Sequence, residues 1–207
     1  MNDMTPMRGV STRDRLLDLA EEAILAKGFA ATSIEELITA VGITKSGFFY
    51  HFRDKNALAK ALIQRYLERD DAIFDALFAR ADELNEDPLH GLLVALKLLA
   101  EELADLPQAH PGCLVATFCY QSQLFNQEIR DLNAAGILAW RARFRGRFAL
   151  IEARYPPRPG VDLDALADMA MGIIEGAILA GRALKDPRIL PGQILLYRDY
   201  VRTVFAG

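Results

Sequence analysis

Several features that would assign this 207-residue chain to common protein classes are missing from its sequence. It has only two cysteines, Cys113 and Cys119, which are too few for the disulfide framework of a small secreted domain. No basic segment followed by an apolar run opens the chain, and the most apolar stretch, 166–184, contains Asp168, Glu175 and Arg182. Because secretion and membrane insertion are both disfavoured, we expect a cytoplasmic protein with no membrane partner.

Motifs of common catalytic and cofactor sites are also absent. The sequence has no Gly-x-Ser-x-Gly elbow, no glycine-rich phosphate loop and no metal-ligand spacing. His90 and His110 are too isolated to suggest a metal site, and the three histidines suggest no catalytic triad. We therefore expect neither an enzyme nor a protein that carries a cofactor or metal.

Positive charge is scarce overall but concentrated in one segment. The net charge of −4 argues against a protein that coats nucleic acid through bulk electrostatics. Between residues 43 and 60, however, a single anion, Asp54, stands against four cations: Lys45, Arg53, Lys55 and Lys60. This segment is the first candidate for contact with a polyanion.

Apolar residues recur at helical spacing along the chain, which predicts an all-α protein of about nine helices. The first should begin near Thr12 and end where Gly28 can take the left-handed conformation. A second short helix should start at Ser33, with Glu36 completing a capping box, and stop at Gly42.

The next two helices complete a DNA-binding arrangement. Thr44 can cap a third helix that runs to about Phe52, and Asp54 can cap a long fourth helix that reaches about Leu84. Two short helices joined by a turn with glycine have helix-turn-helix spacing, which lets the second helix lie in the major groove. We expect a three-helix DNA-binding domain at residues 1–60 and a helical effector-binding and dimerisation domain at 61–207.

The segment Thr44-Lys45-Ser46-Gly47-Phe48-Phe49-Tyr50-His51-Phe52-Arg53-Asp54-Lys55 resembles the recognition helix of the TetR/AcrR family of regulators. Gly28-Phe29 and Thr32-Ser33 lie at the family's distances upstream, so the resemblance covers residues 12–60. It implies that Ser33, Tyr50, His51 and Lys55 contact the DNA backbone. It assigns base reading to Thr44, Lys45, Ser46 and Phe49.

Some residues in this segment have other expected roles. Phe48 and Phe52 are four apart and should pack inward as core. Glu35 occupies a position where some relatives carry a base-contacting cation, so a contact from the second helix is in doubt. Arg8, Arg13 and Arg15 could reach a minor groove or phosphate, or could be ordinary solvated charges.

One short recognition helix reads few base pairs, so specific binding needs two half-sites held by two-fold symmetry. The apolar segment 163–184 offers small residues for close helix approach, and the last helix can join it in a bundle across the axis, as the resemblance implies. The glycines could instead serve packing within one chain. The candidate interface residues are Gly172, Gly176, Ala177, Ala180, Leu195 and Val201.

The larger part of the chain should hold a small-molecule effector in an apolar pocket. Candidate lining residues are Cys113, Phe118, Trp140 and Phe144. Cys113 stands at an expected helix start, which favours a thiolate, and the Gly-Cys-Leu triplet resembles a subset of the family in which some members respond to electrophiles or oxidants. A buried, inert thiol is the alternative.

Four alternating arginines, Arg141, Arg143, Arg145 and Arg147, could be solvated or could bind an anionic effector. The function that the sequence predicts is a homodimeric, ligand-responsive transcription regulator that binds double-stranded operator DNA. We expect a repressor released by a small molecule or by reaction of Cys113. The competing hypothesis is a helical small-molecule carrier without DNA function.

Overall fold

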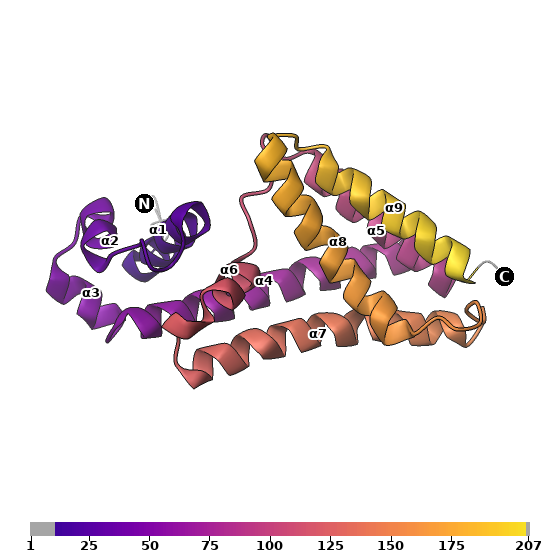
Figure 1. Cartoon of the computed structure of the whole chain (residues 1–207), viewed down its shortest axis with the longest axis horizontal. Helices are drawn as coiled ribbons and strands as arrows, with labels where there is room; N and C mark the ends of the chain where they lie inside the picture. Colours follow the sequence, from indigo (N-terminus) through magenta and orange to yellow (C-terminus); the bar gives the residue numbers. More distant parts are fainter. Residues whose placement is uncertain (1–10, 206–207) are drawn as a thin grey trace, which may run out of the picture.

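The computed structural model describes residues 11–205, and this part of the chain is all-α, as the sequence predicts (Figure 1). A short 3-10 turn, Ser122–Leu124, joins α6 to α7. No helix within the described residues is long and apolar enough to cross a membrane. The helices are α1 Thr12–Lys27, α2 Ile34–Val41, α3 Lys45–His51, α4 Lys55–Leu84, α5 Pro88–Ala104, α6 Leu114–Tyr120, α7 Gln127–Glu152, α8 Leu163–Leu184 and α9 Ile189–Phe205.

Local capping sets the starts of the first four helices where the sequence predicts them. Oγ of Ser33 accepts a hydrogen bond from the Glu36 amide at 3.1 Å, and the side chains of Thr44 and Asp54 cap α3 and α4 in the same way. Gly42 ends α2 in the left-handed conformation (φ 77°). Gly28 ends α1 with φ 86° and ψ 161°. The prediction that it adopts the left-handed helical conformation is therefore wrong.

Helix α4 is continuous from Lys55 to Leu84 and connects two hydrophobic cores. Its first turns, including Leu58 and Leu62, pack with α1, α2 and α3, whereas Phe74 and Phe78 pack in the larger C-terminal core. The N-terminal core also contains Leu114 and Phe118 of α6. Helix α6 therefore packs with α1, α2 and α3 although it is distant from them in sequence.

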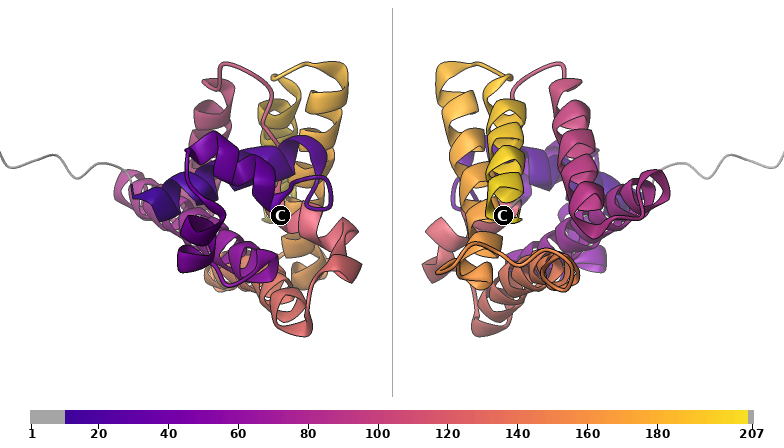
Figure 2. Two further views of the ribbon diagram at one scale, coloured as in Figure 1. Left: turned by 90° about the vertical axis from the view of Figure 1, so that its left-hand side faces the viewer. Right: turned by 90° about the vertical axis from the view of Figure 1, so that its right-hand side faces the viewer.

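The C-terminal core lies between α4, α5, α7, α8 and α9. Helix α9 lies between α5 and α8, and Figure 2 shows the three side by side in its right-hand view. Helix α7 runs alongside the C-terminal part of α4 (Figure 1). Within residues 11–205, this arrangement leaves one face of α8 and α9 uncovered.

The alternating arginines of α7 cross-link helices. Arg147 makes two hydrogen bonds to Asp82 of α4, at 2.7 and 2.9 Å, and Arg143 pairs with Asp71 and Asp75 of the same helix. Arg141 binds both carboxylate oxygens of Asp168 in α8 at 2.7 Å. Arg145 contacts Asp164 at 3.2 Å. Both alternatives for these arginines, a solvated surface and an anion-binding site, are wrong. Each arginine is paired with an acid of α4 or α8.

Candidate DNA-binding surface and effector cavity

The exposed surface of α3 carries most of the side chains that the sequence assigns to DNA contact. Thr44, Lys45 and Ser46 are exposed, while Phe49 is 44% and Tyr50 84% accessible. Phe48 and Phe52 are 0% and 3% accessible, which confirms their expected place in the core. Helix α3 thus has one face anchored on the core and one free for a partner.

Lys45 is not free on this surface. Its Nζ lies 3.1 Å from Oε1 of Glu35 in α2, and both side chains are largely exposed. A backbone hydrogen bond and the ion pair with Lys45 lower the pKa of the Glu35 carboxyl. A phosphate or base that binds Lys45 must therefore compete with this carboxylate.

Lys55 is directed toward the protein rather than along the exposed face of α3. Its Nζ donates to the Phe29 carbonyl at 2.6 Å and lies 4.2 Å from the centre of the Phe29 ring. Burial lowers the pKa of this ammonium group. Lys55 therefore holds the loop between α1 and α2 in place. Its contact with a DNA phosphate stays a prediction, and the N–H groups that do not bind Phe29 would make it.

The arginines near the chain start have structural roles where they are described. Arg15 donates to the Val41 carbonyl at 3.0 Å and so ties α1 to α2. The Arg13 guanidinium lies 5.4 Å from the centre of the Phe52 ring. Arg8 lies outside the described residues.

Phe29 is the junction between the DNA-binding helices and α6. Its amide donates to Oε1 of Gln121 at 2.8 Å, while its carbonyl accepts from Lys55. The Phe29 ring packs against Phe118 and Phe125, at centroid distances of 6.0 and 4.6 Å. A Cβ at Gly28 would lie 2.7 Å from Nε2 of Gln121, so glycine permits this close approach. The sequence does not indicate this junction, because Gln121 belongs to no recognisable motif.

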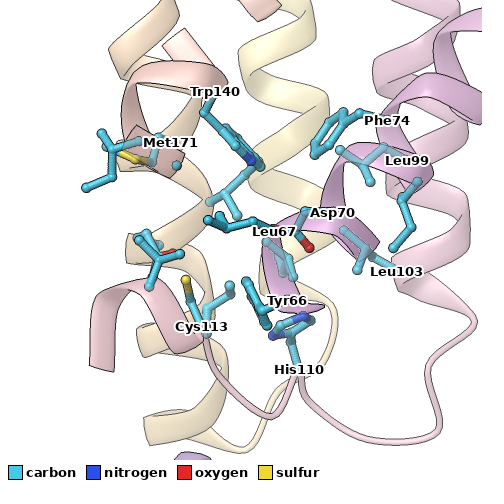
Figure 3. A pocket seen from close by; sticks show the side chains of 18 of the residues that line it. Tyr66, Leu67, Asp70, Phe74, Leu99, Leu103, His110, Cys113, Trp140 and Met171 are labelled. Carbon is cyan, nitrogen blue, oxygen red and sulfur yellow. The ribbon is translucent and has the colours of Figure 1, made fainter. Parts of the chain in front are cut away.

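A cavity of about 290 Å³ lies among α4, α5, α7 and α8 and the segment before α6 (Figure 3). Cys113 and Trp140 line it, as the sequence predicts. Phe118 and Phe144 do not: each is only 1% accessible, Phe118 in the N-terminal core and Phe144 packed against Trp140 at 5.6 Å. Composition identifies apolar residues but not which of them border a given cavity, and Phe118 instead borders a separate hollow with Phe125 and Ile129.

Of the two alternatives for Cys113, the structure favours the buried, protonated thiol over the thiolate. Burial and the neighbouring Glu175 carboxylate raise the pKa of the thiol to about 12. The nearest backbone donor, the Ala116 amide, is 3.5 Å from Sγ and does not offset these effects. Tyr66 and Glu175 lie beside Cys113 in the lining of the cavity.

Two acidic side chains complete the cavity lining, and neither was among the predicted site residues. Asp70 of α4 and Glu175 of α8 both line it and are largely buried. Burial raises the pKa of Asp70 to about 6 and also raises that of Glu175. Burial lowers the pKa of His110, and the nearby Arg182 and Arg69 lower it further. One sequence feature could have indicated these acids: Glu175 is a glutamate within the otherwise apolar stretch 166–184.

Residues 16–62 match the family model of the bacterial regulatory proteins of the tetR family. This match covers about a quarter of the chain, from α1 into the start of α4, which is therefore similar to the DNA-binding segment of that family. The match agrees with the helix-turn-helix segment expected from the sequence.

The TetR-family resemblance extends over most of the fold. A TetR regulator from Chloroflexus aurantiacus, solved by crystallography, has a TM-score of 0.76 and 26% identity, over 92% of this chain and 93% of that one. The probable transcriptional regulator ArpR of Pseudomonas putida is 32% identical over 46% of this chain and 42% of its own. The repressor KstR2 of Mycolicibacterium smegmatis is 26% identical over 50% and 57%. The matched segments thus span about half the length of these two relatives.

The residues predicted for a dimer interface divide into two groups. Gly172 and Gly176 are exposed, with nothing within 4 Å of an added Cβ, and Leu195 is 39% accessible. Ala180 is half-buried. Ala177 and Val201 are 3% and 0% accessible within one chain, so their assignment to a subunit interface is corrected. Both belong to the C-terminal core.

Proposed function

We propose that the protein is a homodimeric repressor that binds operator DNA through α2 and α3 and leaves it when a small molecule occupies the cavity. One observation carries this proposal: the exposed α3 surface and the cavity are connected by the same two elements, α4 and α6. One relative described above is named a transcriptional repressor, which supports the sign of regulation.

DNA contact would follow from the geometry of the N-terminal helices. The N-terminus of α2, capped by Ser33, presents backbone N–H groups to a phosphate. Tyr50 and His51 stand at the end of α3, where the groove meets the backbone. Thr44, Lys45, Ser46 and Phe49 are on the accessible part of α3 and would meet base edges.

A second copy of the chain would cover the free face of α8 and α9. On α8 the exposed residues recur every three or four positions, which places them on one stripe. Leu196 and Tyr200 of α9, 61% and 44% accessible, extend the apolar surface. A two-fold axis here would hold two recognition helices for successive half-sites. The α8 stripe comprises Ala165, Met169, Gly172, Gly176, Leu179 and Ala183.

Coupling between ligand and DNA would run through α4 and α6. Helix α4 contributes Tyr66, Asp70 and Phe74 to the cavity and Lys55 to the Phe29 loop. The α6 segment begins beside Cys113 in the cavity and ends beside Gln121, which accepts from Phe29. A ligand that shifts either element would reorient α3. Typical coupling of about 1–3 kcal/mol changes operator affinity roughly 5- to 150-fold.

Reaction of Cys113 with an electrophile is a second candidate trigger, because the thiol lines the cavity. Its raised pKa keeps it protonated, and the thiolate is the reactive form. Reversible occupancy of the cavity is therefore the trigger that we favour.

The test is binding to duplexes selected from a random library, measured by fluorescence anisotropy at several salt concentrations. Lys45→Ala should weaken binding and lower the salt slope by about 1 per protomer, since each lost cationic contact releases about one counterion fewer. Lys97→Ala, on exposed α5 surface, is the matched control and should change neither. A carrier without DNA function would bind no duplex, and equal effects of the two substitutions would contradict the assigned surface.

A further inference from the structure

The cavity has an unbalanced set of charged groups. Among the described residues that line it are three acids, Asp70, Glu102 and Glu175, and no lysine or arginine. Glu102 is exposed at the rim, whereas Asp70 and Glu175 are largely buried. His110 also lines the cavity, and its lowered pKa favours the neutral imidazole. The described lining therefore carries carboxylates but no lysine or arginine side chain.

The nearest arginines do not supply this charge. Arg69 binds Oε1 of Glu21 at 2.5 Å and lies over the Tyr66 ring, 5.1 Å from its centre. Arg182 donates to the Leu25 carbonyl at 3.3 Å. Despite the attraction of Arg69, the pKa of Asp70 stays raised, through burial and the nearby carboxylates of Asp71, Glu21 and Glu175. Both guanidinium groups are engaged outside the cavity.

Asp70 also lacks a hydrogen-bond donor. Within residues 11–205 its carboxylate makes no hydrogen bond or ion pair, whereas Glu175 lies beside the Cys113 thiol. In Figure 3 the Asp70 carboxylate lies near the centre of the labelled side chains, between Leu67 and Leu103. Buried polar groups normally have a partner, and an unpaired one is costly. A ligand that donates hydrogen bonds at this point would remove that cost.

The rest of the lining suits the apolar part of such a ligand. Tyr66, Phe74 and Trp140 present aromatic surface to the cavity, with the Phe74 and Trp140 rings 4.8 Å apart in an edge-to-face arrangement. Aromatic side chains attract organic cations through the negative faces of their rings. Leu99, Ile174 and other aliphatic residues complete the wall. The volume of about 290 Å³ is near the lower end for small-molecule sites.

We propose that the effector is an organic amine whose protonated nitrogen lies between Asp70 and Glu175 and whose apolar body packs against Phe74 and Trp140. This inference rests on the proposed function only in treating the cavity as the effector site. The ammonium group donates to both carboxylates, and both are ionised in the complex. Asp70 also borders a second, adjoining hollow between α4 and α7, so the carboxylate can be approached from that side.

The experiment measures binding of three probes that share one apolar body: phenylbutylamine, phenylbutanol and phenylbutyrate. Trp140 is the only tryptophan of the chain and lines the cavity, so its fluorescence reports occupancy, with calorimetry as the second readout. The amine should bind at least about tenfold more tightly than the alcohol, and the acid most weakly. A charged hydrogen bond contributes about 1.5–3 kcal/mol, which corresponds to roughly 10- to 150-fold.

Substitutions locate the charge recognition. Asp70→Asn and Glu175→Gln should each lower amine affinity about tenfold or more and leave alcohol affinity nearly unchanged. Glu68→Gln is the matched control, because Glu68 is exposed on α4 and outside the cavity lining. An amine that binds no better than the alcohol, binding of none of the probes, or equal loss in the control would overturn the proposal.

These measurements use the free protein without DNA, so they separate this inference from the repressor function. Amine binding that leaves duplex affinity unchanged would support the ligand class and contradict effector-controlled repression. Duplex binding with no preference for the amine would give the opposite result.

Discussion

Gly176→Glu tests whether the free face of α8 is a subunit interface. An added Cβ at Gly176 meets nothing within 4 Å, so a single chain accommodates the new side chain. Replacing a helical glycine should stabilise the fold by roughly 0.5–1 kcal/mol. In a symmetric dimer, however, the two new carboxylates would be buried near each other. Like charges brought together at an interface cost several kcal/mol, and about 3 kcal/mol raises the dimer dissociation constant roughly 100-fold.

Gly146→Glu is the matched control, because Gly146 of α7 is also helical, exposed and without neighbours within 4 Å. Sedimentation equilibrium at micromolar concentration should find the Gly176→Glu variant largely monomeric and the Gly146→Glu variant dimeric. Circular dichroism should show that both variants are folded. At concentrations low enough for all three proteins to be monomeric, both variants should melt at or above the melting temperature of the parent. The reasoning fails if Gly176→Glu dimerises as tightly as its control.

Three further predictions concern the DNA surface, the Phe29 junction and the cavity. Glu35→Gln should free Lys45 and raise duplex affinity by up to about fivefold per protomer, since an exposed ion pair of up to about 1 kcal/mol no longer competes with DNA; Glu83→Gln, on α4, is the control for this anisotropy measurement. Gln121→Ala should lower hydrogen-exchange protection of the Phe29 amide about fivefold, since one hydrogen bond contributes about 1 kcal/mol. Asp70→Asn should raise stability at neutral pH by at most about 3 kcal/mol, because the folded pKa of about 6 exceeds the unfolded value of 3.8.

The sign of the Asp70 effect follows from proton binding. A carboxyl with a raised folded-state pKa binds more protons folded than unfolded, so the free energy of unfolding falls as pH rises from about 4 to about 6. Thermal denaturation across this range should show a smaller fall for Asp70→Asn. An unchanged pH profile would contradict the burial of this charge, as an unchanged duplex affinity or Phe29 exchange rate would contradict the other two predictions.

The sequence by itself determined the local elements of the fold. Ser33, Thr44 and Asp54 begin their helices because a short side-chain oxygen reaches an amide two or three residues away. Gly42 ends α2 because glycine adopts a positive φ without steric cost. The burial of Phe48 and Phe52 follows from their spacing on one helix. Each of these features depends only on residues within a few positions.

Tertiary packing decided what those elements contact. Lys55 has the position of a phosphate ligand in the motif, but Phe29, which packs beside it, draws the ammonium group inward. Cys113 stands at a helix start, yet Glu175 and burial keep its thiol protonated. Asp70 and Glu175 come from distant helices and meet only when α4 and α8 close the cavity. Caps and turns are short-range interactions that a sequence records directly, whereas charge environment and cavity lining depend on which distant side chains share a small volume.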